Sequence, residues 1–335
     1  MHPSRPELPF TTLTAALRAA GEPTRLRILA LLSEAELTVT DLVEILRQSQ
    51  PRISRHLKLL VSAGLVQRFR EGSWAYFRLA ERGIAADLIA PLDPLDINVV
   101  RDQERLAAVR AARAAAAQAY FRRHAAEWDR IRNLHVADEA VEGAIRAALA
   151  DKPFRSLLDL GTGTGRMLEM FGPDIEHGLG LDLSPEMLAL ARARLDRARL
   201  KHCSVRQGDI YDIAMPPDAF DVVIVHQVLH FLDDSARAVQ EAARMLRPGG
   251  RLLIVDFAPH NLDFLRDEQE HRRLGFGAEA VAHWIEAAGL EMRLQQSLPP
   301  EEGSGREIGV SLWLGQDRRT LVAGAPAVPD TRLRA

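Results

Sequence analysis

The chain has 335 residues, of which 47% are hydrophobic and 27% charged, and its formal net charge at pH 7 is −3. This length exceeds the about 100 to 200 residues of one ordinary domain, so we expect two domains. No stretch reaches the roughly 18 uncharged apolar residues of a membrane span, no export signal opens the chain, and the single cysteine, Cys203, excludes an internal disulfide, so a cytoplasmic protein without a membrane partner is expected.

Basic charge is concentrated early in the chain. Residues 1–80 carry eleven Lys or Arg against seven Asp or Glu, and residues 47–78 carry seven basic side chains against the single acid Glu71. A local excess of basic charge attracts phosphate, even where the whole chain is slightly acidic. This region is therefore the candidate for contact with nucleic acid.

Residues 11–80 contain the start and stop signals of three or four short helices. Pro23 suits the first turn of one helix, and Thr40 is expected to N-cap the next helix, over residues 41–46. Ser49 is expected to cap a further helix.

The helix that follows Ser49 has two contrasting faces. Its apolar side chains share one face, at Ile53, Leu57 and Leu60. Gly64 supplies the left-handed residue that ends it, and residues 65–70 and 74–79, separated by a turn, predict a β-hairpin. The predicted order is helix, turn, helix and wing.

The exposed face of this helix and the hairpin carry the side chains that we expect to contact duplex DNA. These are Ser49, Gln50, Arg52, Ser54, Arg55, His56, Lys58, Arg68 and Arg70. They supply donors for base edges and phosphates in a major groove. A basic row is often only a solvated helix face, but here the charge lies on the second helix and the wing together, which favours DNA binding.

Residues 17–79 resemble the ArsR/SmtB winged helix-turn-helix repressors. Residues 21–29 (GEPTRLRIL) are similar to the helix-opening motif of that family, and residues 49–57 (SQPRISRHL) to its recognition helix. The resemblance implies a homodimer on a two-fold symmetric operator, usually as a repressor released by an effector. Residues 36–42 (ELTVTDL) stand where metal-sensing members have a cysteine pair, and threonine is a poor ligand for soft metals, so no metal site is expected.

The rest of the chain has the pattern of an α/β domain. Residues 107–119 are alanine-rich and predict a connecting helix. Short apolar runs then alternate with helical stretches, which predicts a mainly parallel, Rossmann-like sheet of seven strands. The expected strands are residues 156–160, 178–183, 204–207, 221–226, 251–257, 292–297 and 309–314. The expected parts are an N-terminal α+β domain at 1–83, dimerisation or linker helices at 84–119, the α/β domain at 120–315 and an unstructured tail at 316–335.

Residues 157–166 (LLDLGTGTGR) are a strand that runs into a glycine-rich turn and a helix. Such a turn allows a ligand to approach the backbone closely. Asp182 ends the second strand, where a carboxylate can accept two ribose hydroxyls. Asp209 and Ile210 follow the third, where they can hold an adenine ring. The spacing G-x-G-x-G departs from the G-x-G-x-x-G dinucleotide fingerprint, which argues against NAD.

With residues 247–250 (RPGG) before the fifth strand, residues 120–314 resemble the class I methyltransferases, particularly the UbiE-like branch. The resemblance implies S-adenosylmethionine as cofactor, or S-adenosylhomocysteine as effector. The expected cofactor-binding residues are Asp159, Gly161, Thr162, Gly163, Gly165, Asp182, Leu183, Met187, Asp209, Ile210, His226 and Gln227.

Methyl transfer from a sulfonium mainly needs the acceptor held in line and desolvated, so sequence reports catalysis poorly. His226, at the end of the fourth strand, is the best candidate for a base, and His230 follows one turn along. Local hydrogen bonding and packing is an equal alternative for His226 and the favoured interpretation for His230. Tyr120, Phe121 and Trp128 are candidates for a lid over the ligand or for packing against the sheet.

Two functions remain open. The first is a transcriptional regulator fused to an active methyltransferase that acts on a small molecule. The second is a sensor that does not turn over, in which S-adenosylmethionine or S-adenosylhomocysteine controls operator binding. Methylation of nucleic-acid bases is disfavoured, because residues 226–228 (HQV) stand where an Asn-Pro-Pro-Tyr type motif would follow the fourth strand.

Overall fold

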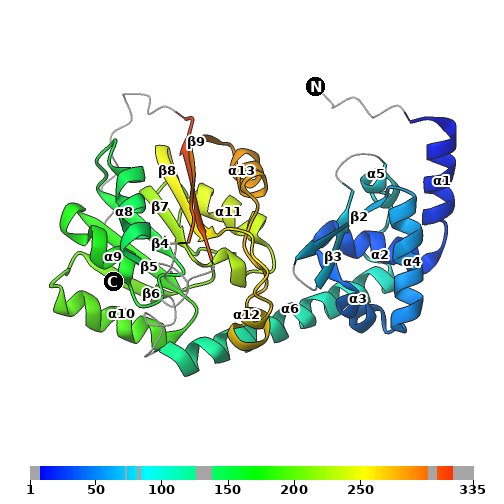
Figure 1. Ribbon diagram of the computed structural model, residues 1–335, viewed down its shortest axis with the longest axis horizontal. Helices are drawn as coiled ribbons and strands as arrows, with labels where there is room; N and C mark the ends of the chain where they lie inside the picture. Colours follow the sequence, from blue (N-terminus) through cyan, green and yellow to red (C-terminus); the bar gives the residue numbers. More distant parts are fainter. Residues whose placement is uncertain (1–7, 72–73, 81–83, 126–137, 301–307, 320–335) are drawn as a thin grey trace. The chain divides into compact units, whose positions relative to one another are not determined.

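The computed structural model describes residues 8–71, 74–80, 84–125, 138–300 and 308–319 (Figure 1). Contacts within the chain divide it into two compact units. The N-terminal unit comprises Met1–Phe121, Phe231–Asp234 and Pro259–Leu274. The C-terminal unit comprises Arg122–His230, Ser235–Ala258 and Gly275–Ala335. None of the helices among the described residues has the length and apolar character needed to cross a membrane.

The N-terminal unit consists of helices around a small antiparallel sheet. Its helices are α1 (Phe10–Ala20), α2 (Pro23–Glu34), α3 (Val39–Leu46), α4 (Gln50–Ser62), α5 (Ala85–Ile89), α12 (Phe264–Gln269) and most of α6 (Ile97–His124). Its strands are β1 (Leu37–Thr38), β2 (Val66–Glu71) and β3 (Trp74–Leu79), in the order β1-β3-β2. The predicted helices and hairpin are therefore present, and β1 is an addition that the sequence pattern did not indicate.

Apolar faces of α2, α3 and α4 build the core of this unit. The side chains that meet there are almost fully buried, among them Ile28, Leu42, Ile45, Ile53, Leu57 and Leu60. In α4 the buried positions recur every three or four residues, which is the spacing of one helix face. The opposite face of α4 is left for solvent.

The N-cap of α3 is Thr38, and the expectation that Thr40 caps this helix is wrong. The Thr38 hydroxyl accepts the Asp41 backbone N–H at 3.2 Å, and the Asp41 carboxylate accepts the Thr38 backbone N–H at 2.9 Å. This reciprocal pair is a capping box, which satisfies two N–H groups that a helix start leaves unpaired. A cap at Thr38 makes Val39 the first helical residue.

The C-terminal unit is a seven-stranded sheet with helices on both faces. Its strands are β4 (Ser156–Leu160), β5 (His177–Asp182), β6 (Cys203–Gln207), β7 (Phe220–His226), β8 (Leu246–Phe257), β9 (Leu290–Leu298) and β10 (Val310–Asp317). Its helices are α8 (Asp138–Leu149), α9 (Arg166–Phe171), α10 (Pro185–Arg197), α11 (Ser235–Arg244) and α13 (Ala278–Ala287), with 3₁₀ turns η2 (Gly172–Asp174) and η3 (Leu229–Phe231). Helices α9 and α10 pack against β4, β5 and β6, whereas α11 and α13 pack on each other and over β8, β9 and β10.

The strand order is β6-β5-β4-β7-β8-β10-β9, and β10 runs in the opposite direction to the other strands of this described sheet. This confirms the predicted Rossmann-like seven-stranded fold. The order reverses between β4 and β7, because the chain winds from β4 outward through β5 and β6 and then returns to the other side of β4. Open α/β sheets bind ligands at such a switch point, outside the carboxyl ends of the strands.

Several strands extend beyond the predicted bounds, and β8 and β10 do so by three or more residues at one end. β8 begins at Leu246, so residues 247–250, which were expected to precede the strand, lie inside it, where the register with β7 shifts. β10 continues to Asp317 because it pairs with both β8 and β9 along that length. The expected unstructured tail therefore does not begin at residue 316, and residues 320–335 lie outside the described part of the chain.

Candidate functional site

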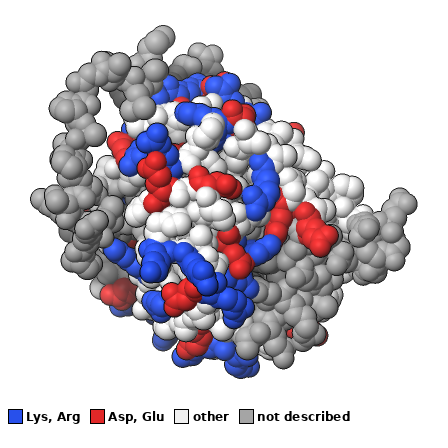
Figure 2. Space-filling model, turned by 90° about the vertical axis from the view of Figure 1, so that its left-hand side faces the viewer, with Lys and Arg blue, Asp and Glu red and all other residues white. Residues whose placement is uncertain are grey.

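Of the nine side chains expected to contact DNA, eight are exposed in the structure. They lie before and along the outer face of α4 and on β2, at Ser49, Gln50, Arg52, Ser54, Arg55, Lys58, Arg68 and Arg70. Their exposure follows from the helix spacing, because the apolar residues occupy the opposite face. On one face of the molecule, by contrast, basic and acidic side chains are intermingled (Figure 2).

His56 is the exception, since it is buried and does not belong to the outer face of α4. It lies three residues after Ile53 and four before Leu60, which places it on the buried side. Burial lowers the pKa of His56; Glu22, whose carboxylate is 3.6 Å from the His56 ring, partly offsets this, and nearby arginines lower the pKa further. The expectation that His56 lies on the exposed face of the helix is therefore wrong.

The second site lies at the carboxyl ends of the parallel strands. Between β4 and α9 the chain turns through Gly161, Gly163 and Gly165, each of which has a positive φ. A side chain at Gly161 would collide with Val228, which follows β7. Glycine is needed here both for the backbone conformation and for the close approach of the two strand ends.

The glycine-rich turn is tied to the end of β5 by backbone hydrogen bonds. Gly161 and Thr162 donate their N–H groups to the Leu181 carbonyl at 2.8 and 2.9 Å, and Gly163 donates to Asp182 Oδ2 at 2.8 Å. Asp182 Oδ1 accepts the N–H of Ser184 at 2.9 Å. Burial raises the pKa of Asp182 above its usual value, and the backbone N–H donors oppose that shift.

A side-chain hydrogen bond between Thr162 and Asp159 also stabilises the glycine-rich turn. The hydroxyl of Thr162 donates to Asp159 Oδ2 at 2.6 Å, and both side chains are buried. These two residues were expected to hold a cofactor, and the structure brings them to the same strand end as the glycines. In their present contact they stabilise the turn that a ligand would approach.

The remaining cofactor candidates lie after the neighbouring strands. Asp209 is exposed and its Oδ1 accepts the Tyr211 N–H at 2.9 Å, whereas Ile210 is buried. Gly208, just before them, donates its N–H to the Asp182 carbonyl at 3.1 Å, which ties this loop to β5. Leu183 is partly exposed and Met187 is buried in the first turn of α10.

Gln227, directly after β7, has an unusual environment. Its φ is +55°, a left-handed backbone conformation that residues other than glycine rarely adopt. Its backbone N–H donates to the Val255 carbonyl at 2.7 Å. Its buried Nε2 has no hydrogen-bond partner among the described residues. Strained residues and unpaired buried donors are typical of ligand sites. Gln227 therefore stays a candidate for contact with a cofactor.

His226 and His230 differ in their surroundings. His226, the expected base, is partly buried at the end of β7. His230 Nδ1 lies 2.7 Å from Asp256 Oδ1, and both side chains are almost completely buried. A carboxylate partner fixes the orientation and tautomer of an imidazole. Asp256 was not among the residues expected from the sequence, although an acid within the apolar run of β8 was the available signal.

The lid candidates divide between the described and undescribed residues. Tyr120 is buried, and the ring of Phe121 meets that of Phe231 edge to face, 4.8 Å between centroids. Tyr120, Phe121 and Phe231 all belong to the N-terminal unit. Trp128 lies outside the described residues, so the lid stays a prediction.

Two family models match this chain, one in each of its two parts. Residues 22–68 match the family model described as bacterial regulatory protein, arsR family, and residues 158–254 match that of a methyltransferase domain. Both resemblances expected from the motifs are confirmed. The chain contains an arsR-type helix-turn-helix followed by a methyltransferase domain of the class I fold.

Similar curated proteins match about a third of the chain. A methyltransferase of Bacillus subtilis is 31% identical over 106 residues, an arsenite methyltransferase of Halobacterium salinarum 32% over 118, and a demethylmenaquinone methyltransferase of Thermus thermophilus 37% over 119. These matches cover 31%, 34% and 35% of this chain, and 42%, 30% and 53% of the relatives. The chain therefore spans about half or less of the length of these relatives.

Two solved structures are also similar to the chain. The YcgJ protein of Bacillus subtilis is 19% identical with a TM-score of 0.45, and the match covers 54% of this chain and 100% of that protein. The N-methyltransferase NodS of Bradyrhizobium japonicum, in complex with S-adenosyl-L-homocysteine, is 22% identical with a TM-score of 0.44, covering 54% of this chain and 86% of NodS.

Proposed function

We propose that this chain is a transcriptional repressor that binds duplex DNA as a homodimer, and that its methyltransferase domain uses S-adenosylmethionine to methylate a small molecule. The observation that carries the proposal is the presence in one chain of an exposed basic helix face and a glycine cradle closed by a strand-end carboxylate. Each of the two features serves one half of the function.

The outer face of α4 supplies the DNA contacts. Arg52 and Arg55 are exposed there, and arginine donors can read guanine edges in a major groove. Arg68 and Arg70 on β2 act as a wing that reaches flanking phosphates. A two-fold dimer would place two copies of α4 on successive half-sites of a symmetric operator.

The cradle fits an adenosyl ligand. Gly161 and Gly163 are partly exposed at the end of β4. The carboxylate of Asp182 has lone pairs for ribose hydroxyls besides those that accept Gly163 and Ser184. Asp209 and Ile210 offer an acceptor for the adenine amino group and an apolar surface for its ring. The unpaired Gln227 Nε2 is a donor that a bound ligand would satisfy.

Methyl transfer requires the protein mainly to position the acceptor. S-adenosylmethionine supplies an activated methyl group, and the acceptor must be aligned with it and shielded from water. His226 at the end of β7 is the group we assign to receive a proton from, or to orient, the acceptor.

Binding measurements on the full chain test the proposal. A random duplex library, selected with the protein in the presence and in the absence of S-adenosylhomocysteine, should yield a two-fold symmetric sequence. Calorimetry should show S-adenosylhomocysteine binding that Asp182→Ala weakens and the exposed control Asp196→Ala does not. Failure to enrich any duplex, or equal ligand binding by the two variants, would overturn the corresponding half of the proposal.

A further inference from the structure

Two segments of the methyltransferase region belong to the N-terminal unit. Residues 231–234 follow β7, and residues 259–274, which contain α12, follow β8. Both therefore leave the carboxyl ends of neighbouring parallel strands, and both pack with the helix-turn-helix. A chain that only joined two independent domains would not return twice to the first one.

The segment at 259–274 packs on the hairpin through three arginines. Arg273 forms an ion pair with Glu36, which directly precedes β1, and lies over the ring of Tyr76 in β3 at 4.7 Å. Arg266 Nη1 donates to the Tyr76 hydroxyl at 2.7 Å, and that hydroxyl donates to the Arg272 carbonyl at 3.1 Å. Tyr76 is almost fully buried under these contacts.

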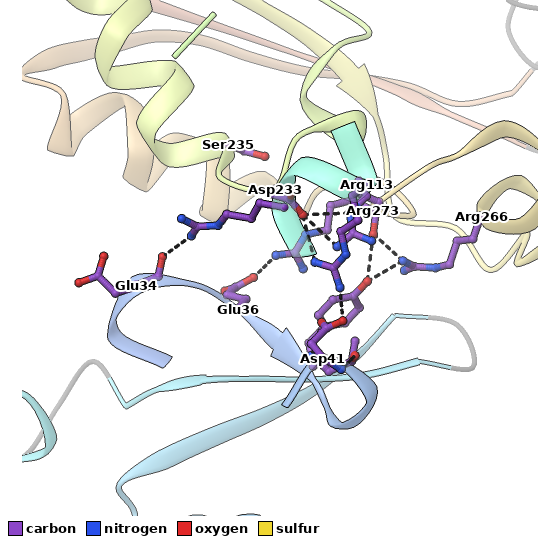
Figure 3. A network of polar contacts seen from close by, with 12 residues as sticks. Glu34, Glu36, Asp41, Arg113, Asp233, Ser235, Arg266 and Arg273 are labelled. Carbon is purple, nitrogen blue, oxygen red and sulfur yellow. Dashed lines mark hydrogen bonds and ion pairs between the residues drawn. The ribbon is translucent and has the colours of Figure 1, made fainter. Parts of the chain in front are cut away.

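Asp233, in the shorter segment, joins the same network. It accepts from Arg272 Nη2 at 2.9 Å and from Arg113 Nη1 of α6 at 3.3 Å. Arg113 is also paired with Asp41, the residue that completes the capping box of α3. Figure 3 shows Arg113 and Arg273 between Asp233 on one side and Glu36 and Asp41 on the other.

These contacts end on the elements that hold the DNA surface. Asp41 belongs to α3, which packs against α4. Tyr76 pairs in register with Phe69 of β2, and their rings stack with centroids 5.7 Å apart. Phe69 stands between the two exposed arginines of the hairpin. The network therefore links the two segments to α4 and to the hairpin arginines.

The same two segments begin beside the ligand cradle. Gln227 and Val228 line the end of β7, three residues before the first segment, and Val228 fills the space beside Gly161. His230, the residue before that segment, is bound to Asp256, near the start of the second. Within the C-terminal unit this buried pair ties the two segments together at their origin, as Asp233 and Arg272 tie them in the N-terminal unit.

We propose that residues 231–234 and 259–274 couple occupancy of the cradle to DNA affinity, through the ion pairs of Asp233 and Arg273. This inference rests on the proposed function and adds its regulation. Ligand bound beside Gln227 favours one arrangement of the two segments, and that arrangement changes how α3 and the hairpin present α4 and the wing. Such coupling is a difference in ligand affinity between two states of the protein, and it acts equally in both directions.

The test compares DNA affinity with and without saturating S-adenosylhomocysteine in the full chain at fixed salt. Wild type should show a ratio of about 5 to 150, the usual range of allosteric coupling. Asp233→Asn and Arg273→Gln should bring that ratio close to one while leaving both ligand affinity and ligand-free DNA affinity within about twofold of wild type. Arg293→Gln, which breaks the exposed pair with Glu291 on β9, is the matched control and should keep the full ratio.

A charge-exchange double variant distinguishes loss of the ion pair from loss of folding. Glu36→Arg combined with Arg273→Glu should restore a ratio that each single change removes. Wild-type coupling that persists in both loss variants overturns the inference, as does a wild-type ratio of one when DNA and ligand each bind tightly; the proposed function survives either result. Absence of DNA binding or of ligand binding in wild type overturns the proposed function and this inference together.

Discussion

The imidazole of His230 and the carboxylate of Asp256 form a buried pair, with Nδ1 and Oδ1 separated by 2.7 Å. Asp256 Oδ1 also accepts the backbone N–H of Phe257 at 2.8 Å, whereas Asp256 Oδ2 is buried without a partner among the described residues. The ring of His230 lies against that of Phe257, with 4.5 Å between the ring centroids. The pair joins the turn after β7 to the end of β8, so its first role is to hold these two chain segments together.

Removal of the imidazole should therefore destabilise the fold. We expect His230→Ala to reduce the free energy of unfolding by about 3 to 5 kcal/mol, because a buried carboxylate loses its partner. Urea unfolding measures this change. His226→Ala, at a partly buried position on the same strand end, is the comparison and should have an effect smaller than about 1.5 kcal/mol. Equal losses in the two variants would show that the pair contributes no special stability.

Asp182 should control ligand affinity. Its carboxylate accepts two backbone N–H groups and is placed to accept ribose hydroxyls, and a hydrogen bond to a charged group contributes about 1.5 to 3 kcal/mol. Asp182→Ala should therefore weaken S-adenosylhomocysteine binding by about 10- to 150-fold in calorimetry. Asp182→Asn, which keeps the shape and one acceptor, should lose less. An alanine variant with wild-type affinity would remove Asp182 from the site.

Periodicity and glycine spacing were sufficient to predict the helices of the helix-turn-helix, the hairpin and the positions of the strands along the chain. Each of these follows from local signals, such as the apolar face of α4 or the turn at Gly161. Local signals fail where the burial of a residue at the edge of a helix face depends on tertiary packing. In the sequence, His56 is one more polar residue beside Arg55. In the structure it lies on the same helix face as the buried Ile53 and Leu60 and is itself buried.

Longer-range features were also beyond the sequence. The pairing of Asp233 with Arg272, or of Arg273 with Glu36, joins residues 39 and 237 positions apart, and no local pattern identifies such partners. The strand bounds of β8 and β10 were misjudged for the same reason, since pairing with a neighbour extends a strand past its apolar run.

Arg55 should be needed for DNA affinity. It is exposed on α4, and loss of an arginine that contacts a base or phosphate reduces the binding free energy by about 1 to 3 kcal/mol, or about 5- to 150-fold in affinity. Fluorescence anisotropy with the selected duplex, across a range of salt concentrations, measures the loss and the salt slope. Arg18→Ala, an exposed arginine of α1, is the control and should bind as wild type does. An unchanged affinity for Arg55→Ala would move the DNA surface away from α4.

His56 should make stability depend on pH. In the folded protein burial lowers its pKa below the usual 6.5, so the unfolded chain binds the proton more readily. Stability should then rise with pH through the window between the lowered pKa and 6.5, and it should fall as the pH drops below 6.5. Unfolding measured at several pH values should show a weaker dependence in His56→Leu than in wild type. Parallel curves for the two proteins would indicate that His56 does not titrate differently in the folded state.

The capping box of α3 separates two neighbouring threonines. Thr38 is buried and both of its capping hydrogen bonds are formed, whereas Thr40 is exposed within the first turn of the helix. Thr38→Ala should lower the free energy of unfolding by about 1 kcal/mol, and Thr40→Ala should change it by less than about 0.5 kcal/mol. Asp41→Asn should exceed the Thr38→Ala effect, because Asp41 also pairs with Arg113. Urea unfolding of the three variants gives this order, and a larger loss for Thr40→Ala than for Thr38→Ala would return the cap to the position that the sequence suggested.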